Sequence, residues 1–518
     1  MTQPLGARGG AAPARLILAF IAAVSAARLL ACLWLGFGDD EAYTLVIARQ
    51  LSLSYFDHPP LHQWILHGFV SVFGEGHGDR LPFWAMQVAT NLPLYALTKR
   101  LFGRDAGLWA IFAFNATAYS LTAPDGVIMP DAPLLLALAT AIWAVAEILF
   151  ASDLGQTRTT WLWLVAGLAF GLAGLAKYSA VLAPLGLLGF FLGSARGRRW
   201  LTDPRSYLAA AIAIALFTPV LIWNARHGWA SLHFQSSRAL GAPTVSLAAV
   251  SASLAALGAQ VVSLSPWAAA PIVAGLYGAL RSRDRESGQR LLLWLALPPV
   301  LLFAALPLVG QRAIPHWFNS GWLFAYPLAG AWVSDLAMAQ ARLWARVSAV
   351  CAVVTLALYA PIVELGPARF APKLAADFAD PTARMFDWAS MATTHSWTAG
   401  GRPPDFVLVE NWRVGGRVGA ALGPGVPICG FGPGPRGFAF TCDAEAVVGH
   451  DALIVTTGAD AASVFSDAIG NFERLGSPEI FSVGRFGAAE IHLAAARAYS
   501  LKGAFPAPYG DDETLSRR

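Results

Sequence analysis

Polar side chains crowd one stretch of an otherwise apolar chain, residues 37–81. This stretch holds six acidic residues and four of the ten histidines of the 518-residue protein. Its candidate reactive groups are Asp39, Asp40, Glu41, Asp57 and His58. A positioned carboxylate can act as a general base that takes the proton of an attacking hydroxyl. We therefore expect Asp40 to be a catalytic base with Glu41 beside it, and Asp39 to be solvated.

Further polar groups follow later apolar segments. Asp131 comes directly before one such segment, and we expect it to be a second or orienting carboxylate. Cations aimed at developing negative charge stabilise a transition state. The residues expected to bind the substrate or its phosphate are Asp57, His58, Lys177, Arg312 and His316. An unpaired Lys177 at a membrane face is costly unless an anion visits it, although snorkelling to lipid headgroups is the alternative.

A metal ion is a weaker hypothesis. Asp57 and His58 are adjacent and could both ligate a divalent cation. Metal sites in proteins need at least a third ligand, and the sequence shows none beside this pair. We therefore predict no metal site and no certain cofactor, with a divalent ion as the open alternative.

The elements that carry these groups are membrane helices. The chain is 56% apolar and 13% charged, whereas soluble domains average about 45–50% apolar and about 25% charged residues. Its net charge of +4 is too small to indicate a nucleic-acid partner. This composition is typical of a polytopic α-helical membrane protein.

Eleven apolar segments are long enough, or nearly so, to cross a bilayer, which takes about 20 residues. They lie at 14–36, 82–98, 106–123, 132–151, 161–176, 178–193, 206–223, 258–280, 291–309, 320–338 and 343–363. The apolar stretch 246–257 is interpreted as a loop helix, because a twelfth span would invert every later loop. Arg28 interrupts the first segment, and we expect it to face the bundle interior or a polar partner.

The distribution of Lys and Arg predicts the orientation. With the N-terminus in the cytoplasm, the cytoplasmic loops hold sixteen basic residues and the external loops hold six. Basic residues favour the cytoplasmic side. We therefore predict a multi-pass protein of a bacterial inner membrane with an external, periplasmic C-terminal part.

The chain changes character near residue 365. Short apolar runs alternate with helical patterns from there, which predicts a soluble α/β domain at 365–518 after a transmembrane domain at 1–364. Cys429 and Cys442 both lie in this external part, where we expect them to form a disulfide. Cys32 and Cys351 lie in predicted spans and are expected to be free, buried thiols.

The motif DDEAY at 39–43, followed by YFDHPPL at 55–61, resembles the first external loop of PMT-like glycosyltransferases of families 39 and 83. Protein O-mannosyltransferases and the aminoarabinose transferase of lipid A belong to this group. The segment PDAP at 130–133 is similar to the second acidic loop of the family. The resemblance covers about 15–340 and implies the GT-C fold.

The resemblance also implies the chemistry. The donor would be a sugar on a polyprenyl phosphate, transferred with inversion at the external face to a lipid or glycan acceptor. Asp40 takes the place of the catalytic carboxylate, and Asp131 matches the second acidic position. His58 stands where the aminoarabinose transferase has a lysine, so the donor preference of that enzyme does not carry over.

Other functions stay open. The acceptor could be a cell-envelope glycolipid, a polysaccharide or a protein hydroxyl. A transporter is disfavoured because its polar groups would lie within helices and its halves would repeat. A non-catalytic scaffold is the remaining alternative.

Overall fold

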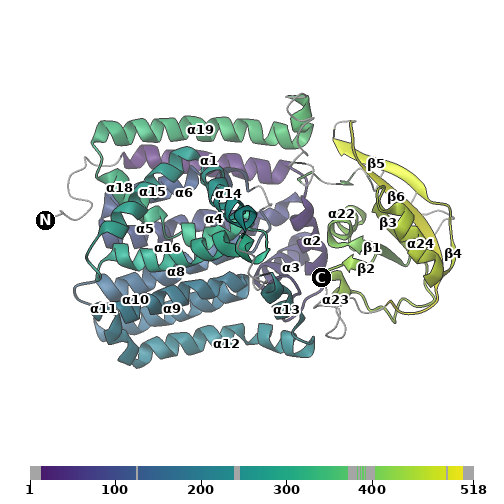
Figure 1. The fold of residues 1–518 in the computed structure, drawn as a ribbon, viewed down its shortest axis with the longest axis horizontal. Coiled ribbons are helices and arrows are strands. Elements are labelled where there is room, and N and C mark those ends of the chain that lie inside the picture. Colours follow the sequence, from purple (N-terminus) through teal and green to yellow (C-terminus); the bar gives the residue numbers. More distant parts are fainter. Residues whose placement is uncertain are drawn as a thin grey trace.

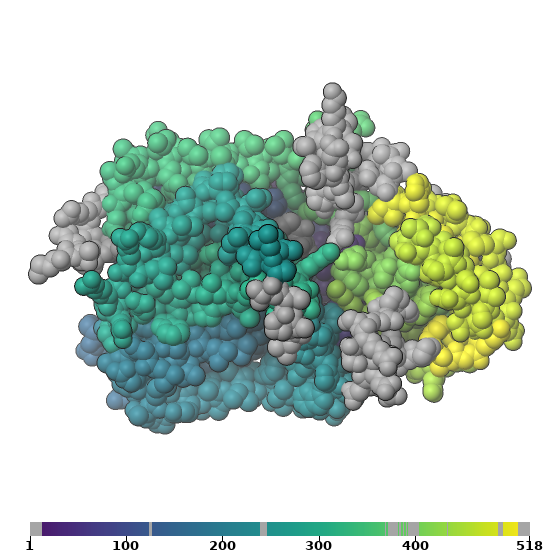
Figure 2. Space-filling model, in the orientation of Figure 1, coloured from purple at the N-terminus to yellow at the C-terminus, as the bar shows by residue number. Residues whose placement is uncertain are grey.

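The computed structural model describes residues 13–123, 127–238, 246–370, 382, 385–386, 388–389, 391, 403–485 and 488–505. Two units are visible in Figure 1, a helical unit and a smaller unit built around a sheet. The first helix, α1, begins at the end of the helical unit that is remote from the sheet. Figure 2 shows the sheet unit, in light green and yellow, against the opposite end.

The first half of the helical unit contains α1 (Ala14–Trp34), α2 (Asp39–Ala48), α3 (Leu61–Phe73), η1 (His77–Arg80), α4 (Leu81–Ala89), α5 (Asn91–Phe102), α6 (Arg104–Asn115), α7 (Ala118–Thr122), α8 (Asp131–Phe150), α9 (Gln156–Ala176), η2 (Tyr178–Val181), α10 (Leu182–Gly193), α11 (Ala195–Arg198) and η3 (Arg199–Thr202). The second half contains α12 (Pro204–Arg226), α13 (Ala230–Ser237), α14 (Leu247–Leu264), α15 (Pro266–Arg281), α16 (Gly288–Ala305), η4 (Leu306–Val309), η5 (Pro315–Phe318), α17 (Asn319–Trp322), α18 (Tyr326–Ser334), α19 (Met338–Leu365) and η6 (Pro367–Arg369). The elements labelled η are short 3₁₀ helices.

Apolar helices of spanning length dominate this unit. Within the described residues, seven helices are long and apolar enough to cross a membrane, or eight if the bent pair formed by η2–α10 and α11–η3 counts as one span. The seven are α1, α8, α9, α12, α14, α19 and the continuous α16–η4. The predicted polytopic helical class is confirmed, but the number of eleven spans is not. Several predicted spans are broken into shorter helices; Pro93, for example, lacks the N–H that would bond the last carbonyl of α4.

One predicted boundary is wrong. The stretch 246–257 is not a separate loop helix, because α14 runs without interruption from Leu247 to Leu264. The predicted span 258–280 is divided at Ser265, whose φ is +68°. Pro266 follows, and a residue before proline is pushed out of the helical conformation. The break therefore lies inside the segment 258–280, which its hydropathy predicts to be one continuous span.

The helical core is centred on α8. In the most apolar 18-residue stretch of this helix 78% of the residues are buried, whereas the corresponding share is 17% in α19. Figure 1 shows α19 and α12 along opposite sides of the unit, with α8 between them. Small residues allow close helix packing. A Cβ on Gly330 of α18 would lie 2.3 Å from the carbonyl oxygen of Ala106 in α6.

The C-terminal unit is an α/β domain, as predicted. Its elements are β1 (Phe406–Asn411), α22 (Trp412–Leu422), β2 (Ile428–Gly434), α23 (Phe438–Thr441), β3 (Ala452–Thr457), α24 (Ala461–Asn471), β4 (Phe472–Leu475), β5 (Glu479–Arg485) and β6 (Ala488–Leu501). The strand order is β2-β1-β3-β6-β4, and β5 also pairs with β6. Strands β1, β2 and β3 are parallel, whereas β6 runs antiparallel to β3.

The predicted disulfide is confirmed, and both other cysteines are free as predicted, but only Cys32 is buried and Cys351 is half-buried. Cys429 of β2 forms a disulfide with Cys442, which directly follows α23. Cys32 and Cys351, both in membrane helices, are free thiols. The bridge fixes the segment between β2 and the end of α23, which lies against the helical unit.

The two units meet through α22 and α2. A Cβ on Gly416 of α22 would lie 2.6 Å from the Cα and the backbone nitrogen of Tyr43 in α2. Only glycine therefore allows this approach of the two helices. Arg49, which follows α2, donates a hydrogen bond of 3.0 Å to the carbonyl oxygen of Gly419. The sheet unit thus packs on the short helix that begins with the three carboxylates.

Candidate active site

The three adjacent carboxylates occupy the first turn of α2. Successive residues of an α-helix point about 100° apart, so neighbours face different surroundings. Asp39 is buried and forms an ion pair with Arg417 of α22, at 2.5 Å between Oδ1 and Nε. The expectation that Asp39 is solvated is therefore wrong. Its carboxylate faces the C-terminal unit.

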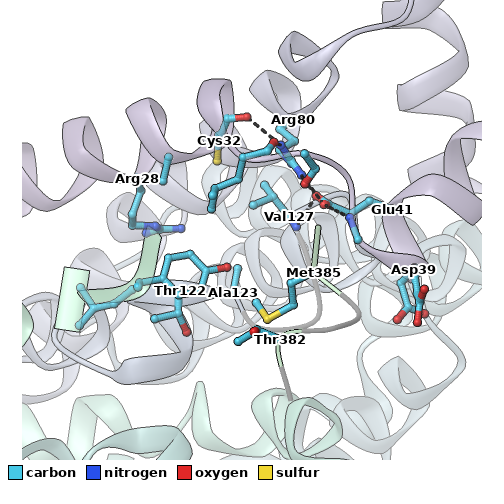
Figure 3. A pocket seen from close by; sticks show the side chains of 17 residues that line it. Arg28, Cys32, Asp39, Glu41, Arg80, Thr122, Ala123, Val127, Thr382 and Met385 are labelled. Carbon is cyan, nitrogen blue, oxygen red and sulfur yellow. Dashed lines mark hydrogen bonds and ion pairs between the residues drawn. The ribbon is translucent and has the colours of Figure 1, made fainter. Parts of the chain in front are cut away.

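Glu41 is buried on the other side of the helix. Its carboxylate accepts hydrogen bonds from Arg80, with Nε–Oε1 at 2.7 Å and Nη2–Oε2 at 2.5 Å. The backbone N–H groups of Val127 and Ile128 also donate to Oε1. Burial by itself would raise the pKa of Glu41, but the Arg80 charge and these hydrogen bonds lower it overall. Figure 3 shows the contacts that tie α2 to η1 and to the turn before α8.

Asp40 is half-buried and lines a cavity of about 460 Å³, here called the α1–α2 cavity. Ligand pockets in proteins typically measure about 300–1,000 Å³. Other polar residues in its wall are Arg28, Asp39, Glu41, Arg80, Thr122, Tyr359 and Thr382. Of the three adjacent carboxylates, Asp40 is the one whose side chain is not buried.

A second cavity, here called the apolar groove, lies between α10, α13 and α16. Its volume is about 220 Å³. Its lining residues are His58, Lys177, Tyr178, Ser179, Val181, Leu182, Gln235, Arg238, Leu302, Phe303, Leu306 and Trp317. Half of these residues are apolar, and the cations Lys177 and Arg238 provide positive charge. Burial and the charge of Arg436 lower the pKa of Arg238, and the charges of Asp57 and Asp40 oppose this only in part.

Lys177 has a permanent partner. Its ammonium lies 2.8 Å from Oδ2 of Asp131, and both side chains are buried. The premise that Lys177 needs a visiting anion is therefore wrong, because Asp131 already neutralises it. Asp131 does not line the α1–α2 cavity; its carboxylate instead orients a lysine of the groove.

His58 is a neutral imidazole in the groove. Burial, and after it the charges of His62 and Lys177, lower the pKa of His58 well below its usual value. A neutral imidazole can donate one hydrogen bond but adds no charge. It therefore suits a phosphate oxygen as a hydrogen-bond donor.

Asp57 is engaged in the contact between the two units. It accepts a hydrogen bond from the hydroxyl of Tyr43, and its Oδ1 lies 3.2 Å from Nη1 of Arg436. The same hydroxyl accepts a hydrogen bond from the backbone N–H of Gly437 at 2.8 Å. Among the residues that the structure describes, no three His, Cys, Asp or Glu side chains could hold a metal ion together.

The structure separates the remaining candidates. Arg312 is exposed and lines neither cavity. His316 is buried in η5, where its neighbour Trp317 reaches the groove instead. Arg238 lies over the ring of Trp317, 4.8 Å from its centre, and was missed as a site residue. Its only signal in the sequence is that it is one of the few basic residues in the external loops.

Known proteins resemble the chain in sequence. Residues 57–223 match the family model described as dolichyl-phosphate-mannose-protein mannosyltransferase. The lipid A galacturonosyltransferase RgtD of Rhizobium johnstonii is 27% identical over 296 residues, which are 54% of this chain and 57% of that protein. The lipopolysaccharide core galacturonosyltransferase RgtB of the same organism is 30% identical over 36% of each chain. The matched part of this chain thus covers little more than half of the length of RgtD and about a third of the length of RgtB.

A solved structure resembles nearly the whole chain. ArnT from Cupriavidus metallidurans, bound to undecaprenyl phosphate, superimposes with a TM-score of 0.64 at 16% identity. The superposition covers 94% of this chain and 98% of that chain. The apo form of the same protein gives a TM-score of 0.63. At this identity the likeness shows the fold alone, in both the helical unit and the sheet unit.

Proposed function

Because the chain has the GT-C fold of PMT-like glycosyltransferases and shares a family model with them, we propose that it is an inverting glycosyltransferase. It moves a sugar from a polyprenyl-phosphate donor to an acceptor hydroxyl at the external face of a bacterial inner membrane. The C-terminal unit then faces the periplasm. The observation that carries this proposal is the position of Asp40, which lines a polar cavity in the helical unit that also contains an apolar groove with the cations Lys177 and Arg238.

The groove supports the donor assignment. A polyprenyl phosphate needs an apolar surface for its chain and cations for its head, and the groove combines both. Lys177 and Arg238 would hold the phosphate, and His58 would donate a hydrogen bond to it. Asp131 would fix the lysine, so it is a positioning residue. Preorganised charge of this kind stabilises a leaving phosphate without reorganisation.

The reaction needs one base. Asp40 takes the proton of the acceptor hydroxyl, whose oxygen forms a bond to the anomeric carbon of the sugar. The bond from that carbon to the lipid phosphate breaks on the opposite side, which inverts the configuration. The phosphate leaves with both electrons of that bond and stays among the groove cations. Glu41 does not touch the substrate in this proposal; with Arg80 it positions α2.

The names of the relatives support an envelope glycolipid, such as lipid A or the lipopolysaccharide core, as the acceptor. The description of the family model favours a second candidate, a protein hydroxyl. Mass spectrometry of envelope glycolipids and proteins from cells with and without the gene separates the two. A sugar missing from a glycolipid supports the first acceptor, and a sugar missing from a protein supports the second.

Substitution of Asp40 tests the proposal. Asp40→Asn keeps the size of the side chain but loses the base, so we expect transfer to fall by about 10²–10⁴-fold. Binding of the polyprenyl-phosphate donor should change little. The control is Asp153→Asn, because Asp153 is an exposed carboxylate far from Asp40 in the sequence. This variant should keep normal turnover. Turnover of Asp40→Asn close to that of the control would show that the base lies elsewhere.

A further inference from the structure

The α1–α2 cavity contains a buried guanidinium that the mechanism above does not use. Arg28 lies within α1, a helix of spanning length, and is 5% exposed. Figure 3 shows its side chain reaching from α1 toward the cavity, with the Glu41–Arg80 pair on the other side. No hydrogen bond or ion pair to Arg28 occurs among the described residues.

The other charges of the cavity wall are already matched. Arg80 is paired with Glu41, and Asp39 is paired with Arg417. Asp40 is the third carboxylate of the wall, and it is the proposed base. Arg28 is therefore the cation of this cavity for which the described structure provides no carboxylate partner.

A buried cation without a partner is costly. Removing an ion from water costs several kcal/mol even after relaxation, and a charged residue within a membrane helix normally pairs or faces a polar cavity. The cavity could supply water to Arg28, but water is a weaker partner than an oxyanion. A planar guanidinium matches carboxylate and phosphate groups with two parallel hydrogen bonds.

We propose that Arg28 binds an oxyanion, a carboxylate or a phosphate, carried by one of the two substrates in the α1–α2 cavity. This inference rests on the proposed glycosyl transfer. The volume of about 460 Å³ is sufficient for a sugar with its charged substituent. The substrate is then an acidic sugar donor, such as a uronic acid on polyprenyl phosphate, or an acceptor with a phosphate or carboxylate near its reacting hydroxyl.

Matched substrates test this inference. Donors that carry galacturonate or galactose on the same polyprenyl phosphate differ only in the carboxylate. Acceptors prepared with and without their phosphate groups form the second pair. Arg28→Met removes the charge but keeps an unbranched side chain, and Arg28→Lys keeps the charge.

The expected result is a loss of selectivity in one pair. The ratio of kcat/KM for the anionic over the neutral substrate should fall about 10- to 100-fold in Arg28→Met, because a hydrogen bond to a charged group is worth about 1.5–3 kcal/mol. Arg28→Lys should restore part of that ratio. A change in the donor pair places the oxyanion on the donor sugar, and a change in the acceptor pair places it on the acceptor. Equal losses for the charged and neutral members of both pairs would overturn the proposal.

A binding measurement keeps the test valid if Arg28→Met does not fold. The thermal unfolding of the wild-type protein is recorded with each member of the two pairs at equal concentration. The anionic member of one pair should give the larger increase in Tm, because a tighter ligand stabilises the folded state more. Equal increases within both pairs would refute the anion site. A wild-type protein that shows this preference but transfers no sugar would refute the glycosyl transfer and leave the anion site supported.

Discussion

Two buried cations, one in each cavity, differ in whether a carboxylate neutralises them. Lys177, in the apolar groove, has Asp131 at 2.8 Å, whereas Arg28, in the α1–α2 cavity, has no such partner among the described residues. A paired cation is neutralised before any ligand arrives, so it is held in place and attracts an anion less strongly. An unpaired cation depends on its ligand for a counter-charge. The groove is therefore organised in advance, and the cavity is better suited to discriminate between ligands.

The largest expected effect is the decrease in Tm when the pair of Lys177 and Asp131 is broken. Asp131→Asn leaves the ammonium of Lys177 buried without its carboxylate, and breaking a buried ion pair in this way costs about 3–5 kcal/mol. Thermal unfolding in detergent should show a clearly lower Tm than that of the wild type. The double variant Asp131→Leu with Lys177→Met removes both charges and should recover most of the loss. An unchanged Tm for Asp131→Asn would mean that the pair contributes little.

The second effect concerns the donor. Lys177→Ala removes a cation from the groove, so we expect affinity for a polyprenyl phosphate to fall about 10-fold or more, as for the loss of one charge-assisted hydrogen bond. Lys177→Arg should lose less, because it keeps the charge. Binding of undecaprenyl phosphate to the purified variants measures both. Equal affinity of the wild type and Lys177→Ala would indicate that Lys177 serves only Asp131.

The smallest expected effect is the change in Tm when the unpaired cation Arg28 is replaced. Arg28→Met removes a buried charge without breaking any ion pair of the described structure, so the Tm without ligand should change little or rise. A rise is expected because an apolar residue of similar length avoids the cost of desolvation. The comparison with Asp131→Asn in the same unfolding experiment is direct. A large decrease in Tm for Arg28→Met would show that Arg28 has a structural partner.

The elements could be predicted far better than their contacts. The alternation of short apolar runs and helical patterns that predicted an α/β domain is visible in β1 and α22, because an apolar run and a periodic pattern are local signals. The division at Ser265 was missed, although Pro266 provided a local signal for it. The hydropathy of 258–280, averaged over the whole segment, predicts one continuous span, and a single proline changes that average little.

The pairs that define the site have no local signal. Glu41 and Arg80 are 39 residues apart, and Asp131 and Lys177 are 46 residues apart. No local pattern in the sequence predicts either pair, because only tertiary packing brings these side chains together. For the same reason Arg312 was expected at the phosphate and is exposed, whereas Arg238 was not expected and lines the groove.

The contact between α2 and the C-terminal unit determines when the site is completed during synthesis. The Tyr43 hydroxyl and the Gly437 N–H that it binds are 394 residues apart in the chain. At about 5–20 residues per second, a ribosome needs roughly 20–80 s to make the intervening chain. Throughout that interval α2 is already made while its partners on the sheet unit do not yet exist. The helix that bears Asp40 thus acquires its final support only after the membrane helices have been synthesised, and translation itself delays the assembly of the site.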